Sequence, residues 1–216
     1  MLEPHEKDLG VVLVDIGGGT TDICVYFEGE VRHSAVIALG GDSISNDLAM
    51  MTQVSIEEAE DIKNNYGSAK AAMASTDLEF ELPHSASETP RNASEHEVSR
   101  YVEARMTEIF QLVKREIERA DIENPVSFGV VLTGGGSLLK NAASLGEEIL
   151  DAQVKIGIPK GLSGVVDVAA SPIYATAIGL VQHPTLAHEE YDPVHRRSAS
   201  MGKLVENIGG WFRGFF

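Results

Sequence analysis

The sequence predicts an α/β protein built on a mixed sheet, and three observations carry this prediction. Residues 11–15 and 23–28 are two apolar runs, rich in β-branched side chains, that flank a glycine-rich turn. Such a pattern is typical of an antiparallel strand pair. Residues 95–120 carry apolar side chains at helical spacing. Residues 126–132 are mostly apolar, which favours a buried strand.

The other elements follow along the chain. Ser55 and Glu58 form a capping-box pattern at the start of a helix that Gly67 is expected to end. The apolar face expected for this helix is Ile56, Ala59 and Ile62. We also expect strands at 31–39, 77–82 and 153–158 and helices at 44–52, 138–150 and 172–182. Three antiparallel strands joined by tight turns would then open the sheet.

The composition is that of a globular protein. The chain has 216 residues, 43% hydrophobic and 23% charged, enough for one large domain or two small ones. Its net charge of −16 argues against nucleic acid as a partner. The single Cys24 cannot form an internal disulfide, which favours a reducing compartment. We expect neither a signal peptide nor a transmembrane helix from the hydropathy pattern.

The first glycine turn carries the clearest chemical signal. Because a strand rather than a helix follows it, it is neither a dinucleotide-binding fingerprint nor a P-loop. Residues without Cβ let backbone N–H groups approach an anion, and threonine hydroxyls can donate as well. Asp15 and Asp22 flank the turn, and an acidic group beside phosphates commonly serves a divalent cation. The alternative is a glycine hairpin without a ligand. The candidate phosphate residues are Gly17, Gly18, Gly19, Thr20 and Thr21.

A second glycine turn, Gly134, Gly135 and Gly136, lies between the buried strand and the helix after it. Its backbone can face a flat ligand because no side chain intervenes. A purely structural turn would look the same. Two such turns at the ends of two core strands fit a nucleotide in a cleft, with phosphates at one turn and the nucleoside at the other.

The first turn resembles the second phosphate motif of the superfamily of actin, Hsp70 and sugar-kinase ATPases. Residues 133–137 resemble its adenosine motif, and residues 171–179 resemble its second connecting motif. The resemblance implies an actin-like, ribonuclease H-like fold that binds ATP and Mg²⁺. It places Asp15 near Mg²⁺ through water, and Glu60 and Lys63 beside the ribose and base. From the residues alone, Glu60 and Lys63 fit equally well on a solvated helix face.

The end of the chain, residues 201–216, has apolar residues at helical spacing but also four glycines, so it is a poor helix in water. Tryptophan, phenylalanine and basic side chains suit the interface of an anionic membrane. A helix docked on the protein's own core is the alternative. A polar linker is expected at 185–200. The membrane-binding candidates are Leu204, Val205, Ile208, Trp211, Phe212, Phe215 and Phe216.

These motifs together resemble the FtsA family of bacterial cell-division proteins. The resemblance implies a peripheral protein on the cytoplasmic face of the inner membrane at the division site. It implies self-association into filaments and binding of the C-terminal peptide of FtsZ, so that the FtsZ ring is anchored. It divides the chain into a core, 1–40 and 125–184, and an inserted α+β subdomain, 41–124, which would hold the FtsZ site.

The chain lacks the first actin-like subdomain of that family and resembles only its C-terminal half. Half a cleft cannot close around ATP, so we expect weak nucleotide binding and negligible ATP turnover. Two other classes share the motifs. A metabolic enzyme of the sugar-kinase or exopolyphosphatase type would have no use for the amphipathic end. An Hsp70-like fragment would need a peptide-binding domain after the cleft.

Overall fold

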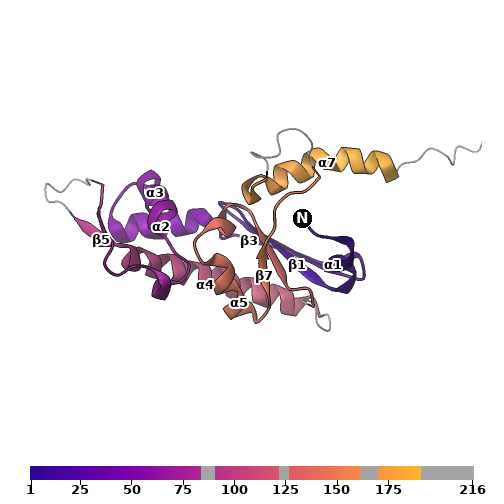
Figure 1. Ribbon diagram of the computed structural model, residues 1–216, viewed down its shortest axis with the longest axis horizontal. Helices are drawn as coiled ribbons and strands as arrows, with labels where there is room; N and C mark the ends of the chain where they lie inside the picture. Colours follow the sequence, from indigo (N-terminus) through magenta and orange to yellow (C-terminus); the bar gives the residue numbers. More distant parts are fainter. Residues whose placement is uncertain (84–90, 122–126, 162–169, 191–216) are drawn as a thin grey trace, which may run out of the picture. The chain divides into compact units, whose positions relative to one another are not determined.

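The computed structural model describes residues 1–83, 91–121, 127–161 and 170–190 (Figure 1). The chain divides into two compact units, residues 1–178 and residues 179–216; the elements below belong to the first, except that helix α7 (Ala175–Glu190) continues from the first into the second. The expected α/β architecture is confirmed. The amphipathic segment 201–216 and residues 191–200 of the expected linker lie outside the described part. Within the described residues, no helix combines the length and apolarity needed to cross a bilayer.

The centre of the fold is a five-stranded mixed sheet with the order β3-β2-β1-β6-β7. Strands β1 to β3 form an antiparallel meander, while β6 and β7 run parallel to β1. The parallel pairing requires a long crossover between β3 and β6, and the helices of the middle of the chain fill it. The strands are β1 (Val11–Ile16), β2 (Thr21–Phe27), β3 (Glu30–Ile37), β6 (Val130–Thr133) and β7 (Val154–Ile156).

Helix α4 (Glu95–Arg119) is the longest element and is packed against both the sheet and the middle helices (Figure 1). It contacts β2, β3 and α5 on the sheet side, and α2, α3 and β5 elsewhere along its length. Most of its apolar stripe, including Val102 and Phe110, is buried. The other elements are α1 (Pro4–Leu9), α2 (Gly41–Thr52), α3 (Ile56–Tyr66), η1 (Ala71–Met73), β4 (Glu79–Glu81), β5 (Asn92–Ser94), η2 (Gly135–Leu138), α5 (Ala142–Leu150), η3 (Pro172–Tyr174) and α7 (Ala175–Glu190).

Several expected boundaries are wrong, each for a local reason. Helix α2 begins at Gly41, not residue 44, because its first N–H groups bond to the glycine turn before β2. Ile56 is 59% exposed rather than buried, since it is the first residue of α3. Helix α5 begins at Ala142 because a 3₁₀ turn and the left-handed Asn141 precede it. Helix α7 runs to Glu190 and so includes residues 185–190 of the expected linker.

Helix α1 is absent from the sequence prediction. It is only six residues long, too short for a periodic signal, and it depends on contacts far along the chain. Its buried Glu6 forms an ion pair with Lys155, which lies in β7. Nothing in the local sequence reports that pairing.

Candidate functional site

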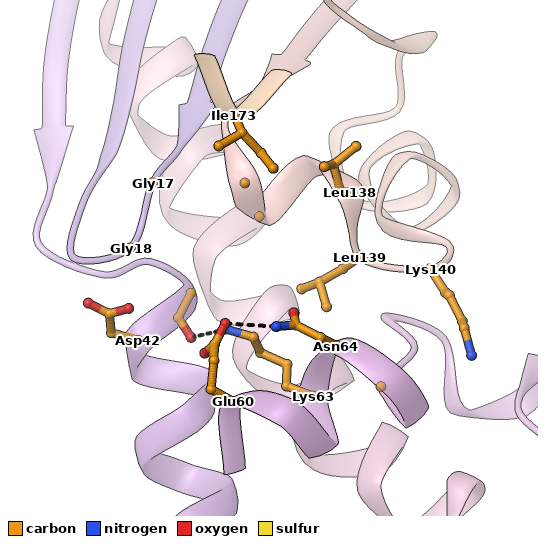
Figure 2. A pocket seen from close by; sticks show the side chains of 14 residues that line it. Gly17, Gly18, Asp42, Glu60, Lys63, Asn64, Leu138, Leu139, Lys140 and Ile173 are labelled. Carbon is orange, nitrogen blue, oxygen red and sulfur yellow. Dashed lines mark hydrogen bonds and ion pairs between the residues drawn. The ribbon is translucent and has the colours of Figure 1, made fainter. Parts of the chain in front are cut away.

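The main feature of the site is a cavity of about 440 Å³ that lies between the two glycine turns and α3 (Figure 2). That volume falls within the range of small-molecule sites in proteins. The predicted residues Gly17, Gly18, Gly135, Gly136, Glu60 and Lys63 all line it, although they come from three separate stretches of sequence. The other lining residues are Gly41, Asp42, Asn64, Gly67, Leu138, Leu139, Lys140 and Ile173.

The first turn is fastened to the N-terminus of α2. Gly41 N–H donates to the carbonyl of Gly17 and Asp42 N–H donates to the carbonyl of Gly18, both at 2.9 Å. This leaves no room for a side chain before α2: a Cβ on Gly40 would lie 2.3 Å from the carbonyl oxygen of Gly18. The carbonyls of the turn therefore point at α2. Two backbone hydrogen bonds thus hold the first turn against the start of α2.

The rest of the first turn is not in the cavity. Thr21 is fully buried and its hydroxyl donates to the carbonyl of Leu39 at 2.9 Å, so this hydroxyl is already engaged. The Thr20 hydroxyl is exposed and donates to Asp22 at 3.0 Å. Gly19 has open space where a Cβ would stand. Thus Gly19, Thr20 and Thr21 lie next to the cavity-lining glycines in sequence but do not line the cavity.

Asp15 is at the end of β1, where it is paired with Asp22 of β2 and Thr133 of β6. It does not line the cavity either. Its carboxylate accepts a hydrogen bond from the hydroxyl of Thr176 at 2.7 Å. Among the residues that the structure describes, no three Asp, Glu, His or Cys side chains come close enough to form a metal site. Asp15 alone fits only a cation whose other ligands are phosphates and water.

The three glycines of the second turn have different constraints. Gly134 has φ +79°, and a Cβ there would lie 2.2 Å from the Asp15 carboxylate. A Cβ on Gly136 would lie 2.3 Å from the side chain of Ile16. Gly135, by contrast, lines the cavity and has nothing within 4 Å of its Cβ position. Packing therefore requires glycine at 134 and 136. It does not require glycine at 135.

The α3 wall of the cavity is a hydrogen-bonded cluster around Lys63 (Figure 2). Lys63 is buried and its ammonium donates to Glu60 at 2.5 Å, to Ser45 at 3.0 Å and to the carbonyl of Gly41 at 3.2 Å. Ser45 also donates to Glu60. Burial raises the pKa of Glu60, but the hydrogen bonds from Lys63 and Ser45 outweigh it and leave the pKa below its usual value. The carboxylate is therefore ionised near neutral pH.

Opposite the polar wall, the cavity has apolar sides. Leu138 and Ile173 are exposed large side chains that line it from η2 and η3, and Figure 2 shows them on the same side of the cavity.

Asn64 is a lining residue that could have been found from the sequence, since it lies four residues after Glu60 on one helix face. No local sequence pattern predicts that Ile173 and Lys140 line the cavity, because only the tertiary fold brings them there.

Solved structures of other proteins share this fold. MreB5 of Spiroplasma citri bound to ADP superposes with a TM-score of 0.65 at 21% identity, over 85% of this chain and 56% of that one. The PilM chain of a PilM–PilN type IV pilus biogenesis complex superposes with a TM-score of 0.60 at 19% identity, over 83% of this chain and 47% of that one. The chain therefore has an actin-like fold.

Sequence comparison gives the family. The family model described as cell division protein FtsA matches residues 12–179, and the chain belongs to this family. Cell division protein FtsA of Pseudomonas aeruginosa is 42% identical over 85% of this chain and 44% of its own length. That of Escherichia coli K12 is 32% identical over 99% of this chain and 53% of its own length. The chain thus spans about half the length of these relatives.

Proposed function

We propose that the cavity is one side of an ATP site, and that the chain carries this half-site for an actin-like cell-division protein. The observation that carries the proposal is the convergence of the two glycine turns on one cavity of about 440 Å³. The fold relative MreB5 is bound to ADP in one solved structure and to AMPPNP in another. A nucleotide has an anionic end and a flat apolar end, and the cavity has a glycine turn for each.

The polyphosphate would lie at the first turn. Gly17 and Gly18 bring backbone close to the cavity, and Gly19 and Thr20 continue the turn beyond it. The Thr21 hydroxyl already donates to the carbonyl of Leu39, so Thr21 would help to hold the hairpin rather than donate to a phosphate. Asp15 would hold Mg²⁺ through water, and the ion would neutralise phosphate charge when bound.

The adenosine would lie between the second turn and α3. Gly135 leaves space for a planar ring, and Leu138 and Ile173 supply the apolar contacts that a base requires. The Glu60 carboxylate is paired with the Lys63 ammonium, so the two charges balance and the α3 wall offers acceptor oxygens that suit a sugar. This arrangement orients the nucleotide with its phosphates toward α2. Because half a cleft cannot close around ATP, binding rather than turnover is the activity proposed for this chain.

The role proposed for the whole protein is inferred from its family. As a member of the FtsA family, the protein would assemble at the division septum and anchor the FtsZ ring to the cytoplasmic membrane. It would bind the FtsZ C-terminal peptide through residues 41–124 and self-associate into filaments. The segment 201–216, with Trp211 and its neighbouring phenylalanines, would attach it to anionic lipid.

Titration of the isotope-labelled chain with ATP, followed by backbone amide NMR, tests the half-site. We expect millimolar ATP to shift the amides of Gly17, Gly18 and Gly135. Gly135→Leu should abolish these shifts because the side chain would enter the cavity. Gly179→Leu is the matched control, since that glycine also has nothing within 4 Å and does not line the cavity. Unshifted amides at saturating ATP would contradict the proposal.

A further inference from the structure

The first turn of α7 is fastened to the ends of two core strands. The Thr176 hydroxyl donates to Oδ2 of Asp15, the last but one residue of β1, at 2.7 Å. The N–H of Gly134, which follows β6, donates to the carbonyl of Pro172 in η3 at 3.2 Å. Ala175, between these two points, is buried. The start of α7 is therefore docked on the end of the sheet where the two glycine turns begin.

The carboxylate of Asp15 is held on both sides. Oδ2 accepts from Thr176, and a hydrogen bond of 2.7 Å from a hydroxyl to a carboxylate is of the strong, charge-assisted kind. Oδ1 lies against the backbone of the second turn, 2.2 Å from the place that a Cβ on Gly134 would take. Among the residues that the structure describes, the ion pairs do not include Asp15. The carboxylate thus has a fixed direction, and no described cationic side chain balances its charge.

We propose that Thr176 is a positioning residue for a divalent cation, and that cation binding and the docking of α7 strengthen one another. This inference rests on the proposed ATP site, with Asp15 as the residue that holds the hydrated ion. A carboxylate has about four lone-pair positions, so Thr176 can keep one of them while water molecules of the ion take others. Groups that orient the ligands of a metal are commonly worth about 10- to 100-fold in metal affinity.

The coupling acts in both directions. If the Thr176 hydrogen bond raises the affinity for the cation by some factor, the bound cation must favour that hydrogen bond by the same factor. Helix α7 is continuous from Ala175 to Glu190 and passes from the first compact unit into the second. Its first turn is thus the point where the state of the cation site reaches a helix that extends beyond the first unit. A threonine that only stabilised the helix would act in the same way with and without the ion.

Amide NMR titrations of the full chain with ATP, in Mg²⁺ and in EDTA, test the positioning role. Thr176→Val keeps the shape of the side chain but removes the hydroxyl, so it should weaken ATP binding in Mg²⁺ by about tenfold and leave binding in EDTA unchanged. Thr176→Ser should restore the parent affinity. Thr76→Val is the matched control, because it also removes a hydrogen bond from an exposed threonine to an aspartate, Asp77, and does not line the cavity.

Hydrogen exchange of the α7 amides tests the reverse direction. In the parent chain, residues 175–178 should exchange more slowly with ATP and Mg²⁺ than with ATP and EDTA, and Thr176→Val should remove the difference. Exchange that ignores the ion in the parent chain would overturn the coupling. If Thr176→Val binds ATP like the parent chain in Mg²⁺, or weakens it equally in EDTA, the positioning role is wrong and the ATP site stands. If ATP fails to bind the parent chain, the proposed function and this inference are both wrong.

Discussion

The second glycine turn makes a sharp prediction, because two adjacent glycines should respond oppositely to the same change. At Gly134, φ is +79° and ψ is 172°, a region that only glycine adopts without strain. Alanine there carries a conformational cost of about 1–3 kcal/mol. Its Cβ would also lie 2.2 Å from the Asp15 carboxylate and 2.5 Å from the carbonyl oxygen of Ile16. Such crowding adds about 1–3 kcal/mol.

The sum for Gly134→Ala is a loss of about 2–6 kcal/mol in the free energy of unfolding. For a chain of this size, each 1 kcal/mol shifts the melting temperature by about 2–4 °C, so a fall of about 10 °C is expected. Gly135→Ala meets nothing within 4 Å. It should change the free energy of unfolding by no more than about 0.5–1 kcal/mol, and in the stabilising direction if it restricts the unfolded chain.

Urea denaturation followed by far-ultraviolet circular dichroism compares both variants with the parent chain. The slope of the transition should stay constant, which would show that both act on stability rather than on the compactness of either state. Equal destabilisation by the two substitutions would refute the reasoning, since it would mean that a Cβ at position 135 is as crowded as one at position 134. A harmless Gly134→Ala would refute it as well.

Two further predictions concern the end of the chain and the α3 wall. With anionic vesicles the intact chain should float, whereas a chain ending at Ser200 and the Trp211→Glu variant should stay in solution; identical behaviour of all three would exclude an interfacial anchor. Because hydrogen bonds lower the pKa of Glu60 below 4.5 in the folded state, its contribution is present above that pH and is lost as the pH falls through the folded pKa. Glu60→Gln should therefore flatten the acid limb of the stability curve, measured by denaturation between pH 3 and pH 6; an unchanged limb would contradict this.

Local patterns in the sequence predict most of the fold. The capping box at Ser55 and the stop at Gly67 bound α3 as expected. The apolar face predicted from the helical spacing of residues 95–120 is mostly buried in α4, although Tyr101 is only partly buried. Both glycine turns are in the expected strand contexts. These features succeed because each depends on residues close together in the sequence.

The prediction fails where contacts between residues far apart in the sequence determine a helix boundary or a hydrogen-bond partner. The start of α2 depends on carbonyls of Gly17 and Gly18, more than twenty residues earlier. The commitment of Thr21 to Leu39, and of Lys63 to Gly41, cannot be read from spacing, because each is a contact between separate elements. Sequence motifs identified the stretches that meet at the cavity. They did not tell which atoms of those stretches are free to meet a ligand.

Helix α4 has a mechanical consequence. With 25 residues it is about 37 Å long at 1.5 Å per residue, and it contacts the sheet as well as α2, α3 and β5. An uninterrupted helix moves as a nearly rigid rod. If its sheet end tilts by about 5°, the other end moves by about 3 Å, a displacement comparable to the diameter of a water molecule. Small adjustments of the sheet are thereby magnified at the opposite end of the helix, where β5 and η1 are packed on it.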